Sequence, residues 1–314
     1  MLSFLARRIA IAVPTLVLAS MIIFALQQLL PGDTATALSG EERDPEVIAF
    51  IREKYHLDRP LPVRYLLWAK GVLQGDLGES IRLQKPVIDL VAEKLPVTLQ
   101  LACLAMVIAL VIGVPMGIVS AVRQGTTADY VANGIALWGL SIPNFWLGIM
   151  MILFFSVYLG WLPASGYVPP SESLIDNLKA MIMPAFVLGN AIAAVMMRHT
   201  RAAMLQVLQS DYVRTARAKG VSPLGVILRH CLRNAAVPII TLGALEFGQL
   251  LSGAVLTEQI FSVPGFGKLM VDAVFNRDYA TVQGVVICTA TTYIVLNLMA
   301  DVAYFLVNPK LRRS

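Results

Sequence analysis

The sequence predicts an all-α, polytopic membrane protein with six transmembrane helices and one short, water-soluble helical insert. Of its 314 residues, 57% are hydrophobic and only 14% are charged, and the mean hydropathy is +0.70. Soluble globular domains carry about 25% charged residues. The charges are also unevenly placed, because 20 of the 45 charged side chains fall within residues 31–95. This composition excludes an ordinary soluble domain, a disordered chain and a disulfide-stabilised scaffold.

Six apolar segments are long enough to cross a bilayer. A transmembrane helix needs about 20 mostly apolar residues, because the hydrocarbon layer is about 30 Å thick and each helical residue rises about 1.5 Å. We expect the first segment to be retained, since no small-residue cleavage site follows it. The expected spans are residues 9–30, 97–122, 131–158, 180–200, 236–257 and 283–307.

Prolines lie in or beside five of these spans. A proline lacks the backbone donor of a helical residue and tends to kink its helix. Two interpretations stay open: proline is simply commoner in membrane helices, or the bundle consists of bent helices that can rock. The five residues are Pro14, Pro115, Pro143, Pro184 and Pro238.

The distribution of basic residues predicts the orientation. With the N-terminus inside, the cytoplasmic segments hold 13 Lys and Arg residues, and the short outer loops hold 3. Positively charged segments resist translocation, so this imbalance predicts that both termini are cytoplasmic.

The insert after the first span reads as short amphipathic helices separated by turns. Pro60-Leu61-Pro62 breaks one helix, Gly75-Asp76-Leu77-Gly78 forms a turn, and a third helix runs from Pro86 to Leu95. About 65 residues is marginal for an independent core. We therefore expect the insert to lean on the bundle or on a partner. Its role is either a structural cap or a docking surface for an extracytoplasmic protein.

The motifs of common enzymes are missing from the sequence. No Gly-x-x-x-x-Gly-Lys-Ser/Thr loop is present to bind a nucleotide, and no His-Glu-x-x-His or Gly-x-Ser-x-Gly occurs. Gly265-Phe266-Gly267-Lys268 is interpreted as a turn on the outer side. Cys103, Cys231 and Cys288 are too widely spaced for a disulfide framework or a metal site. We expect no catalytic residue and no metal ligand. If the chain serves powered transport, the energy must come from another chain or from an ion gradient.

The large cytoplasmic loop has a defined local pattern. Residues 198–233 hold seven basic residues and one acidic residue, Asp211. A helix is predicted from Tyr212 to Lys219, Gly220 suits the left-handed stop after it, and Ser222-Pro223 opens a second helix. We call residues 211–222 the elbow.

The first helix of the elbow combines small and basic side chains. Small residues let another backbone approach closely, and arginines make forked contacts with carboxylates. We therefore expect the elbow to fit a groove in a cytosolic partner. The small residues are Thr215, Ala216, Ala218 and Gly220, and Arg214 and Arg217 flank them.

At this point the sequence resembles a known family. Residues 211–220, Asp-Tyr-Val-Arg-Thr-Ala-Arg-Ala-Lys-Gly, resemble the coupling loop of ABC importer permeases, and more narrowly the dipeptide/oligopeptide/nickel permease family. Residues 232–238, Leu-Arg-Asn-Ala-Ala-Val-Pro, continue the similarity. The broader pattern begins Glu-Ala-Ala-x-x-x-Gly, and Arg214 and Thr215 replace its glutamate and first alanine.

Shorter segments along the whole chain agree with this resemblance, which implies the type I ABC importer permease fold. The expected divisions are 1–30 (N-terminal tail and first span), 31–95 (extracytoplasmic insert) and 96–314 (spans two to six, with the coupling loop at 201–233). The agreeing segments are residues 30–33, 75–78, 262–267 and 276–279.

The resemblance implies the permease subunit of an ATP-driven importer of small peptides, either di- and oligopeptides or glutathione-like compounds, in a bacterial inner membrane. It implies a second homologous permease, two cytosolic ATP-binding subunits or domains and an extracytoplasmic substrate-binding protein as partners, and no nucleic acid. The chain itself would hold no cofactor, because ATP and Mg would bind to the ATPase subunits. The alternatives are a permease for nickel or a nickel chelate and, more distantly, a self-sufficient secondary transporter.

Two sets of residues are predicted to serve transport. Under the resemblance, the elbow residues that couple to the ATPase are Asp211, Tyr212, Arg214, Thr215, Ala216, Arg217 and Gly220. Independently, Glu246 lies near the middle of the fifth span, where an unpaired carboxylate costs roughly 2.5–3.5 kcal/mol. We expect its stripe to line the translocation path or the seam between permeases, with a structurally paired carboxylate as the alternative. The stripe comprises Gly243, Glu246, Gln249, Gly253 and Thr257.

Overall fold

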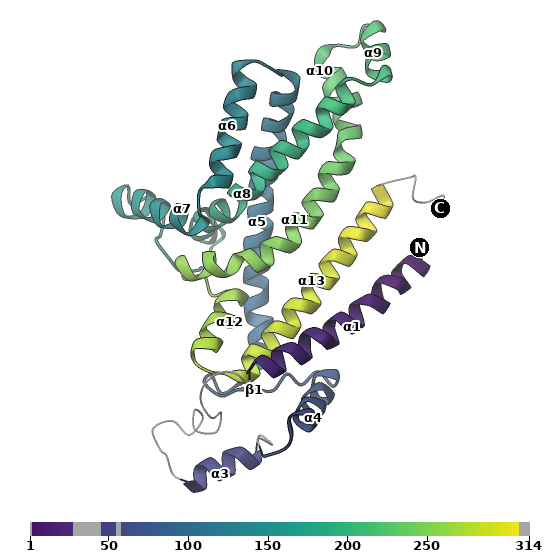
Figure 1. Cartoon of the computed structure of the whole chain (residues 1–314). Helices are drawn as coiled ribbons and strands as arrows, with labels where there is room; N and C mark the ends of the chain where they lie inside the picture. Colours follow the sequence, from purple (N-terminus) through teal and green to yellow (C-terminus); the bar gives the residue numbers. More distant parts are fainter. Residues whose placement is uncertain (1, 28–44, 55–57, 308–314) are drawn as a thin grey trace. The chain divides into compact units, whose positions relative to one another are not determined.

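The structure is a computed structural model that describes residues 2–27, 45–54 and 58–307 (Figure 1). The predicted all-α class is confirmed. Among the described residues, the strands are limited to a short antiparallel hairpin of β1 (Glu79–Ser80) and β2 (Lys85–Pro86). Contacts divide the chain into two compact units. Unit 1 comprises Met1–Pro96 and Lys268–Ile294, and unit 2 comprises Val97–Gly267 and Val295–Ser314.

Within unit 1, the insert packs on the first helix. The insert contains α3 (Pro45–Lys54) and α4 (Leu61–Leu73), and α1 (Leu2–Gln27) precedes it. The hydroxyl groups of Ser20 on α1 and Tyr65 on α4 lie 2.9 Å apart. The Phe24 ring packs against the rings of Tyr65 and Trp68, at centroid distances of 5.6 and 5.9 Å. The insert thus obtains from α1 the apolar contacts that its own short helices lack.

The hairpin of the insert is fixed to the last helix, α13 (Tyr279–Val307). The Ser80 hydroxyl donates to the Asp278 carboxylate, which is 4% exposed, and the Thr281 hydroxyl donates to the same oxygen. A β-carbon at Gly284 would overlap the Val87 side chain, so the two segments touch closely. The predicted turn before the hairpin is confirmed, since Gly78 has φ +87° and its amide donates to Asp76.

One boundary in the insert was wrong. The predicted third helix, Pro86–Leu95, is the beginning of α5, which runs without interruption from Val87 to Val122. Pro96 lies inside this 36-residue helix, and the division between the two units falls directly after it. The Gly265–Lys268 turn is also corrected, because α12 (Phe266–Phe275) begins within it.

Unit 2 continues from α5 through a series of helices that lead to the elbow and back. Its fourth predicted span extends beyond residue 200 as α8, so Arg198 and Arg201 lie inside the helix. The elements are α6 (Thr127–Ser141), α7 (Asn144–Met151), the π-helix η1 (Ile152–Tyr158), α8 (Leu174–Leu208), α9 (Asp211–Ala218), α10 (Pro223–Gly225), the π-helix η2 (Val226–Cys231) and α11 (Leu232–Ile260).

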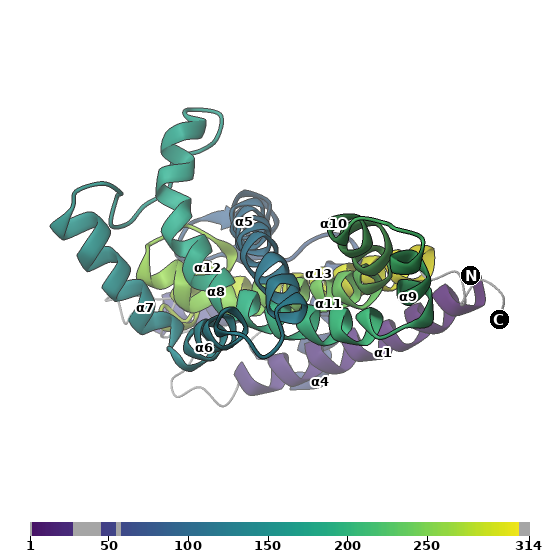
Figure 2. The ribbon, with the colours of Figure 1, turned by 90° about the horizontal axis from the view of Figure 1, so that it is seen from above.

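The third predicted span is sharply bent. Helices α6 and α7–η1 meet at an angle of 98°. In Figure 2, α6 is viewed nearly along its axis, whereas α7 lies across the view. Pro143 supplies no backbone donor to continue α6, and the preceding Ile142 is extended (φ −80°, ψ 126°), as a residue before proline prefers. Pro14, Pro115, Pro184 and Pro238 lie inside continuous helices.

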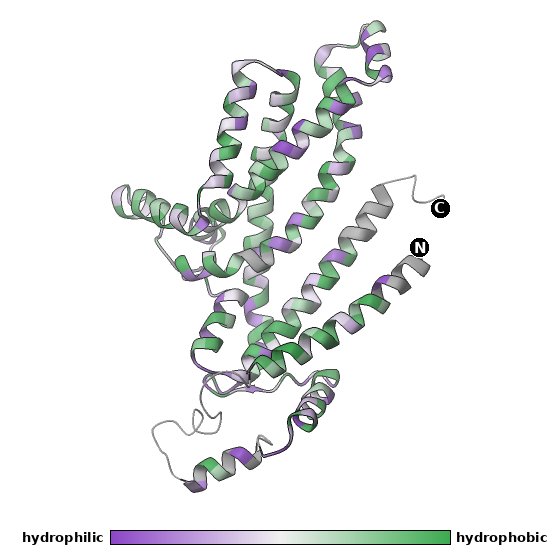
Figure 3. Ribbon diagram, viewed as in Figure 1, coloured by the Kyte–Doolittle hydropathy of each residue, from purple (hydrophilic) through white to green (hydrophobic). Residues whose placement is uncertain are grey.

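The apolar helices fit a membrane protein. In the part of the chain that the structure describes, three helices are long and apolar enough to cross a membrane, and two bent pairs raise this number to five. A shorter apolar stretch, Ala10–Leu26, lies in α1. Figure 3 shows apolar residues along most of these helices and hydrophilic residues gathered at α9.

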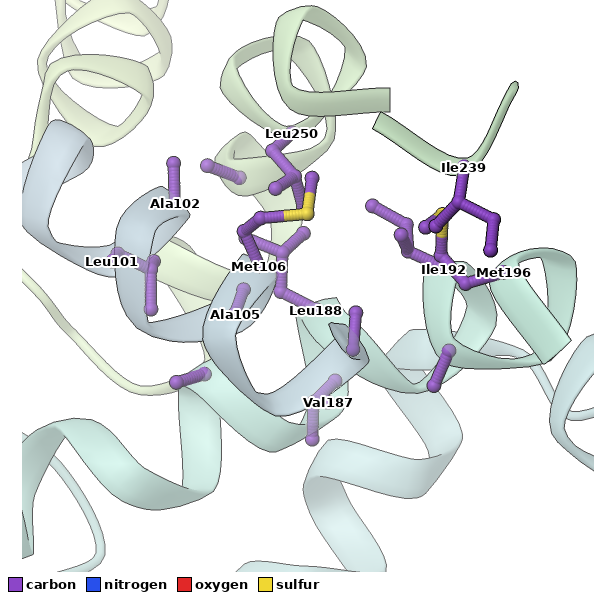
Figure 4. Packing of buried hydrophobic residues seen from close by; sticks show 14 of the residues in the cluster. Leu101, Ala102, Ala105, Met106, Val187, Leu188, Ile192, Met196, Ile239 and Leu250 are labelled. Carbon is purple, nitrogen blue, oxygen red and sulfur yellow. The ribbon is translucent and has the colours of Figure 1, made fainter. Parts of the chain in front are cut away.

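The core of unit 2 forms around α8. Met106 of α5 packs with Leu188 of α8 and Leu250 of α11, and further along α8, Met196 packs near Ile239 of α11 (Figure 4). All five side chains are at most 9% exposed. Helix α8 thus joins the other helices of the unit, and its position determines theirs.

Glycines allow α5 and α8 to approach at backbone distance. A β-carbon at Gly113 or Gly117 of α5, or at Gly189 of α8, would lie 2.5–2.6 Å from a backbone oxygen of the facing helix. Lipid tails are as apolar as leucine, so close packing of small residues is a main source of helix association in membranes. The two helices therefore depend on these glycines for their separation.

We expect Gly113→Val to lower the melting temperature of the purified protein, because overpacking of a tight contact costs about 1–3 kcal/mol. Gly134→Ala on α6 is the matched control, since no heavy atom lies within 4 Å of its β-carbon position. Thermal unfolding in detergent measures both variants. Equal melting temperatures for Gly113→Val and the unmodified protein would contradict the close approach.

Candidate functional site: the coupling elbow and the polar positions of unit 2

The elbow lies between α8 and α11, at the end of unit 2 where α5 turns into α6 (top of Figure 1). Ser210 occupies the cap position before α9, although its hydroxyl donates back to the Val207 carbonyl of α8. After α9, the Ser222 hydroxyl accepts the Gly225 amide at 3.3 Å and Pro223 is the first residue of α10. The predicted helix–glycine–helix arrangement is confirmed.

Gly220 ends α9 through a Schellman motif. The Val221 amide donates to the Ala216 carbonyl, and the Gly220 amide donates to the Arg217 carbonyl. Gly220 has φ +76°, a left-handed conformation that glycine adopts without steric cost. No heavy atom lies within 4 Å of its β-carbon position, so the backbone conformation, and not a lack of space, favours glycine here.

Two side chains hold the elbow on unit 2. Val213 is fully buried and Ala216 is 6% exposed, and helix α9 packs against η2. Val226 and Cys231 of η2 belong to the same buried cluster. Since α9 follows α8 directly and η2 continues into α11, the elbow is attached to both long helices.

The remaining predicted elbow residues are exposed, whereas Ala216 faces its own protein and offers no surface to a partner. The side chains of Arg214 and Asp211 are 78% and 97% exposed and lie 3.6 Å apart, which is a weak surface pair. The face open to a partner is thus polar, with two arginines and one aspartate. Its members are Asp211, Tyr212, Arg214, Thr215, Arg217 and Gly220.

Helix α9 of the elbow packs against a π-helical segment that precedes α11. Residues 226–231 form η2, and α11 follows without a break. A π-helix is rare and occurs often at functional sites. It was not predicted, because the sequence pattern of residues 226–231 does not distinguish it from an ordinary helix.

The stripe on α11 does not form one uniform face. Glu246 and Gly243 are half-buried, Gln249 is exposed and Thr257 is buried. Gly253 is part of α11, but its surroundings lie outside the described residues. Among the described residues, no hydrogen bond or ion pair reaches the Glu246 carboxylate.

Sequence reasoning missed a second carboxylate, Glu258, near the other end of α11. Its side chain is fully buried and accepts a hydrogen bond of 2.5 Å from the Thr98 hydroxyl, which in turn accepts the Phe266 amide at 2.7 Å. A β-carbon at Gly265 would overlap the carboxylate. The two glycines of the segment Gly265-Phe266-Gly267 were the available signal, because glycine permits the loop to close over Glu258.

A second polar chain closes the same end of unit 2. The Tyr167 hydroxyl donates to Gln100 at 3.0 Å, Gln100 donates to the fully buried Asn177, and Asn177 donates to the Val168 carbonyl. Burial raises the pKa of the Tyr167 phenol above its ordinary value. These bonds fix the loop before α8 to α5.

The arrangement supports movement rather than covalent chemistry. A bundle of apolar helices carries an exposed elbow that is attached to two long helices, which is an architecture typical of a membrane transport subunit. The chain belongs to the family described as the binding-protein-dependent transport system inner membrane component, whose model matches residues 113–313. A second family model, which describes the N-terminal part of such membrane components, matches residues 1–102. The resemblance at residues 211–220 is thereby confirmed: the chain is the permease subunit of an ABC importer, and ATP is hydrolysed in partner subunits.

Similar proteins cover the whole chain. The di/tripeptide transport system permease protein DppB of Pseudomonas aeruginosa is 41% identical over 100% of both chains. The glutathione transport system permease protein GsiC of Escherichia coli is 41% identical over 99% of both.

The solved structures show the same fold at low sequence identity. A chain of the inward-facing MetNI methionine ABC transporter has a TM-score of 0.58 and 18% identity, and the match covers 70% of this chain and 96% of that one. An amino acid ABC transporter chain has a TM-score of 0.51 and 17% identity over 72% and 94%. The predicted type I importer fold is confirmed.

We expect Arg214→Glu to weaken binding of the ATPase subunits at least tenfold without changing the melting temperature, because Arg214 is exposed. Val213→Ala, by contrast, should lower stability by about 1–2 kcal/mol, since it removes buried methyl groups. Pull-down of the ATPase and thermal unfolding measure the two effects. Wild-type ATPase binding by Arg214→Glu would show that this face is not the contact surface.

Proposed function

We propose that the chain imports small peptides, di- and oligopeptides or glutathione-like compounds, as one of two homologous permeases in a complex. Two cytosolic ATP-binding subunits or domains and an extracytoplasmic substrate-binding protein complete this complex. The observation that carries the proposal is the elbow, whose exposed polar face can dock on an ATPase while Val213 and Ala216 hold it to unit 2. The named substrates of the two relatives support the peptide class.

In this proposal the chain lies in a bacterial inner membrane with both termini in the cytoplasm. The excess of Lys and Arg residues in the segments that the sequence predicts to be cytoplasmic supports this orientation. ATP and Mg bind to the partner ATPase subunits, and the chain needs no cofactor of its own. Closure of the ATPases on ATP moves the elbow, and the elbow moves α8 and α11.

The proposal is tested by reconstituting the complete complex in lipid vesicles. ATP-dependent uptake should be stimulated by binding protein loaded with peptide or glutathione. Stimulation by binding protein loaded with a nickel chelate instead would favour the nickel alternative. Solute accumulation by this chain alone, without ATPase subunits, would identify a secondary transporter and overturn the proposal.

Substitutions at Gly220 test the role of the elbow in this system. Gly220→Trp should insert in the membrane and abolish uptake, because the side chain would project into the partner interface. Gly220→Asn is the control: asparagine tolerates the left-handed conformation, so uptake should remain near the wild-type rate. Normal uptake by Gly220→Trp would remove the elbow from the coupling surface.

We further propose that Glu246, with Gly243, Gln249 and Gly253, lines the translocation path or the seam between the two permeases. The half-buried Glu246 carboxylate, which has no partner among the residues that the structure describes, supports this, because an ionised group at membrane depth requires water or a partner.

Cysteine accessibility tests the position of Glu246. With Cys103, Cys231 and Cys288 replaced by serine or alanine, Glu246→Cys should react with a water-soluble maleimide in at least one transport state. Leu250→Cys, at a position that is 1% exposed on the same helix, should not react. Protection of Glu246→Cys in every state would contradict the proposal.

A further inference from the structure

Asp129, at the start of α6, is the centre of a buried polar cluster that joins three helices. Its Oδ1 atom accepts the Arg201 Nε of α8 at 3.0 Å, and its Oδ2 atom accepts Arg201 Nη2 at 3.0 Å. The hydroxyl of Ser120, in the last turn of α5, also donates to Oδ1. The backbone amide of Gly125 and the side-chain amide of Asn133 donate to the same carboxylate at 3.0 and 2.7 Å.

The cluster is saturated and mostly shielded from solvent. The Asp129 side chain is 6% exposed and the Arg201 side chain is 26% exposed. A buried ion pair usually gives no net stability over apolar residues of similar size, whereas a forked arginine–carboxylate contact fixes both distance and angle. The cluster is therefore better suited to setting geometry than to stabilising the bundle.

The surroundings of the cluster leave α6 little freedom relative to α8. At the far end of α6, the Asn190 side chain of α8 donates to the Gly139 carbonyl at 3.0 Å, so α6 is fixed to α8 at both ends. One turn before Ser120, a β-carbon at Gly117 would lie 2.6 Å from the Thr200 β-carbon, which places α5 against α8 beside Arg201.

Along α8, Arg201 lies between the contact of Thr200 with Gly117 and the elbow. Helix α8 continues from Arg201 to Leu208, and α9 begins at Asp211. The elbow and the turn between α5 and α6 also lie at the same end of unit 2 (Figure 1). A displacement of the elbow thus reaches Arg201 along two turns of continuous helix.

Building on the proposed coupling role of the elbow, we propose that Asp129 and Arg201 are positioning residues that transmit its movement from α8 to α5 and α6. The fork makes α5, α6 and α8 turn together. Without it, the start of α6 can lag behind α8, whereas the glycine contact still holds α5 against α8. ATP is then hydrolysed without a matching change of access across the membrane.

The test measures substrate imported per ATP hydrolysed by the complete complex in vesicles. Asp129→Asn should reduce this ratio at least tenfold while the complex still assembles and hydrolyses ATP. Arg201→Lys keeps the charge and loses the fork, and should reduce the ratio at least threefold. Asp176→Asn is the matched control, because Asp176 also lies on α8 but forms an exposed pair with Lys179. Its ratio should stay within twofold of the wild type.

Asp129→Asn/Arg201→Gln removes both charges, so that no unpaired charge disturbs folding, and its ratio should also fall. If this variant assembles and keeps the wild-type ratio of substrate imported to ATP hydrolysed, the inference is overturned. Failure of every variant to assemble would also overturn it, because the cluster would then be needed for folding. If the wild-type complex neither binds ATPase subunits nor couples ATP to uptake, the proposed function itself fails. If the wild-type complex couples ATP hydrolysis to uptake and the variants keep the same ratio, only the positioning role is refuted and the proposed function stands.

Discussion

The close contact between α5 and α8 is the constraint on which unit 2 depends. In a bilayer, apolar side chains gain little by leaving lipid, so helices associate where their backbones can touch. Gly113, Gly117 and Gly189 provide this contact. With α5 fixed in this way, α8 offers its remaining surface to α6, α7 and α11, and methionine and leucine side chains fill the spaces between them. The helix that organises the unit is also the helix that leads into the elbow.

This arrangement separates the requirements of packing from those of contact with a partner. The elbow conformation comes from local signals, a left-handed glycine and a serine cap, and its attachment comes from two small apolar side chains. The exposed basic residues between them take little part in the fold. These exposed residues can therefore contact another subunit, whereas the buried residues are constrained by packing within this chain.

The sequence alone predicted the elements with strong local signals. The apolar runs located the helices, and Gly220 and Ser222 located the elbow to within a residue. Long-range polar contacts could not be predicted, because no local pattern indicates that Asp129 meets Arg201 or that Thr98 meets Glu258. The burial of Ala216 was missed for a similar reason: its small side chain suits a partner groove and its own helix equally well. Pro143 shows the same limit, since five prolines looked alike and one of them ends a helix.

The π-helix η2 has a consequence for how this region can change over evolution. Its wider turns hold an additional residue compared with an α-helix over the same rise. Loss of one residue between Val226 and Cys231 would therefore restore ordinary α-helical winding and leave the side chains of α11 facing nearly the same directions. Glu246 would keep its neighbours, whereas loss of one residue within α11 itself would rotate the residues on one side of the deletion by roughly 100°, because an α-helix has 3.6 residues per turn. A change of one residue in chain length is thus tolerated better in this short segment than in α11 itself.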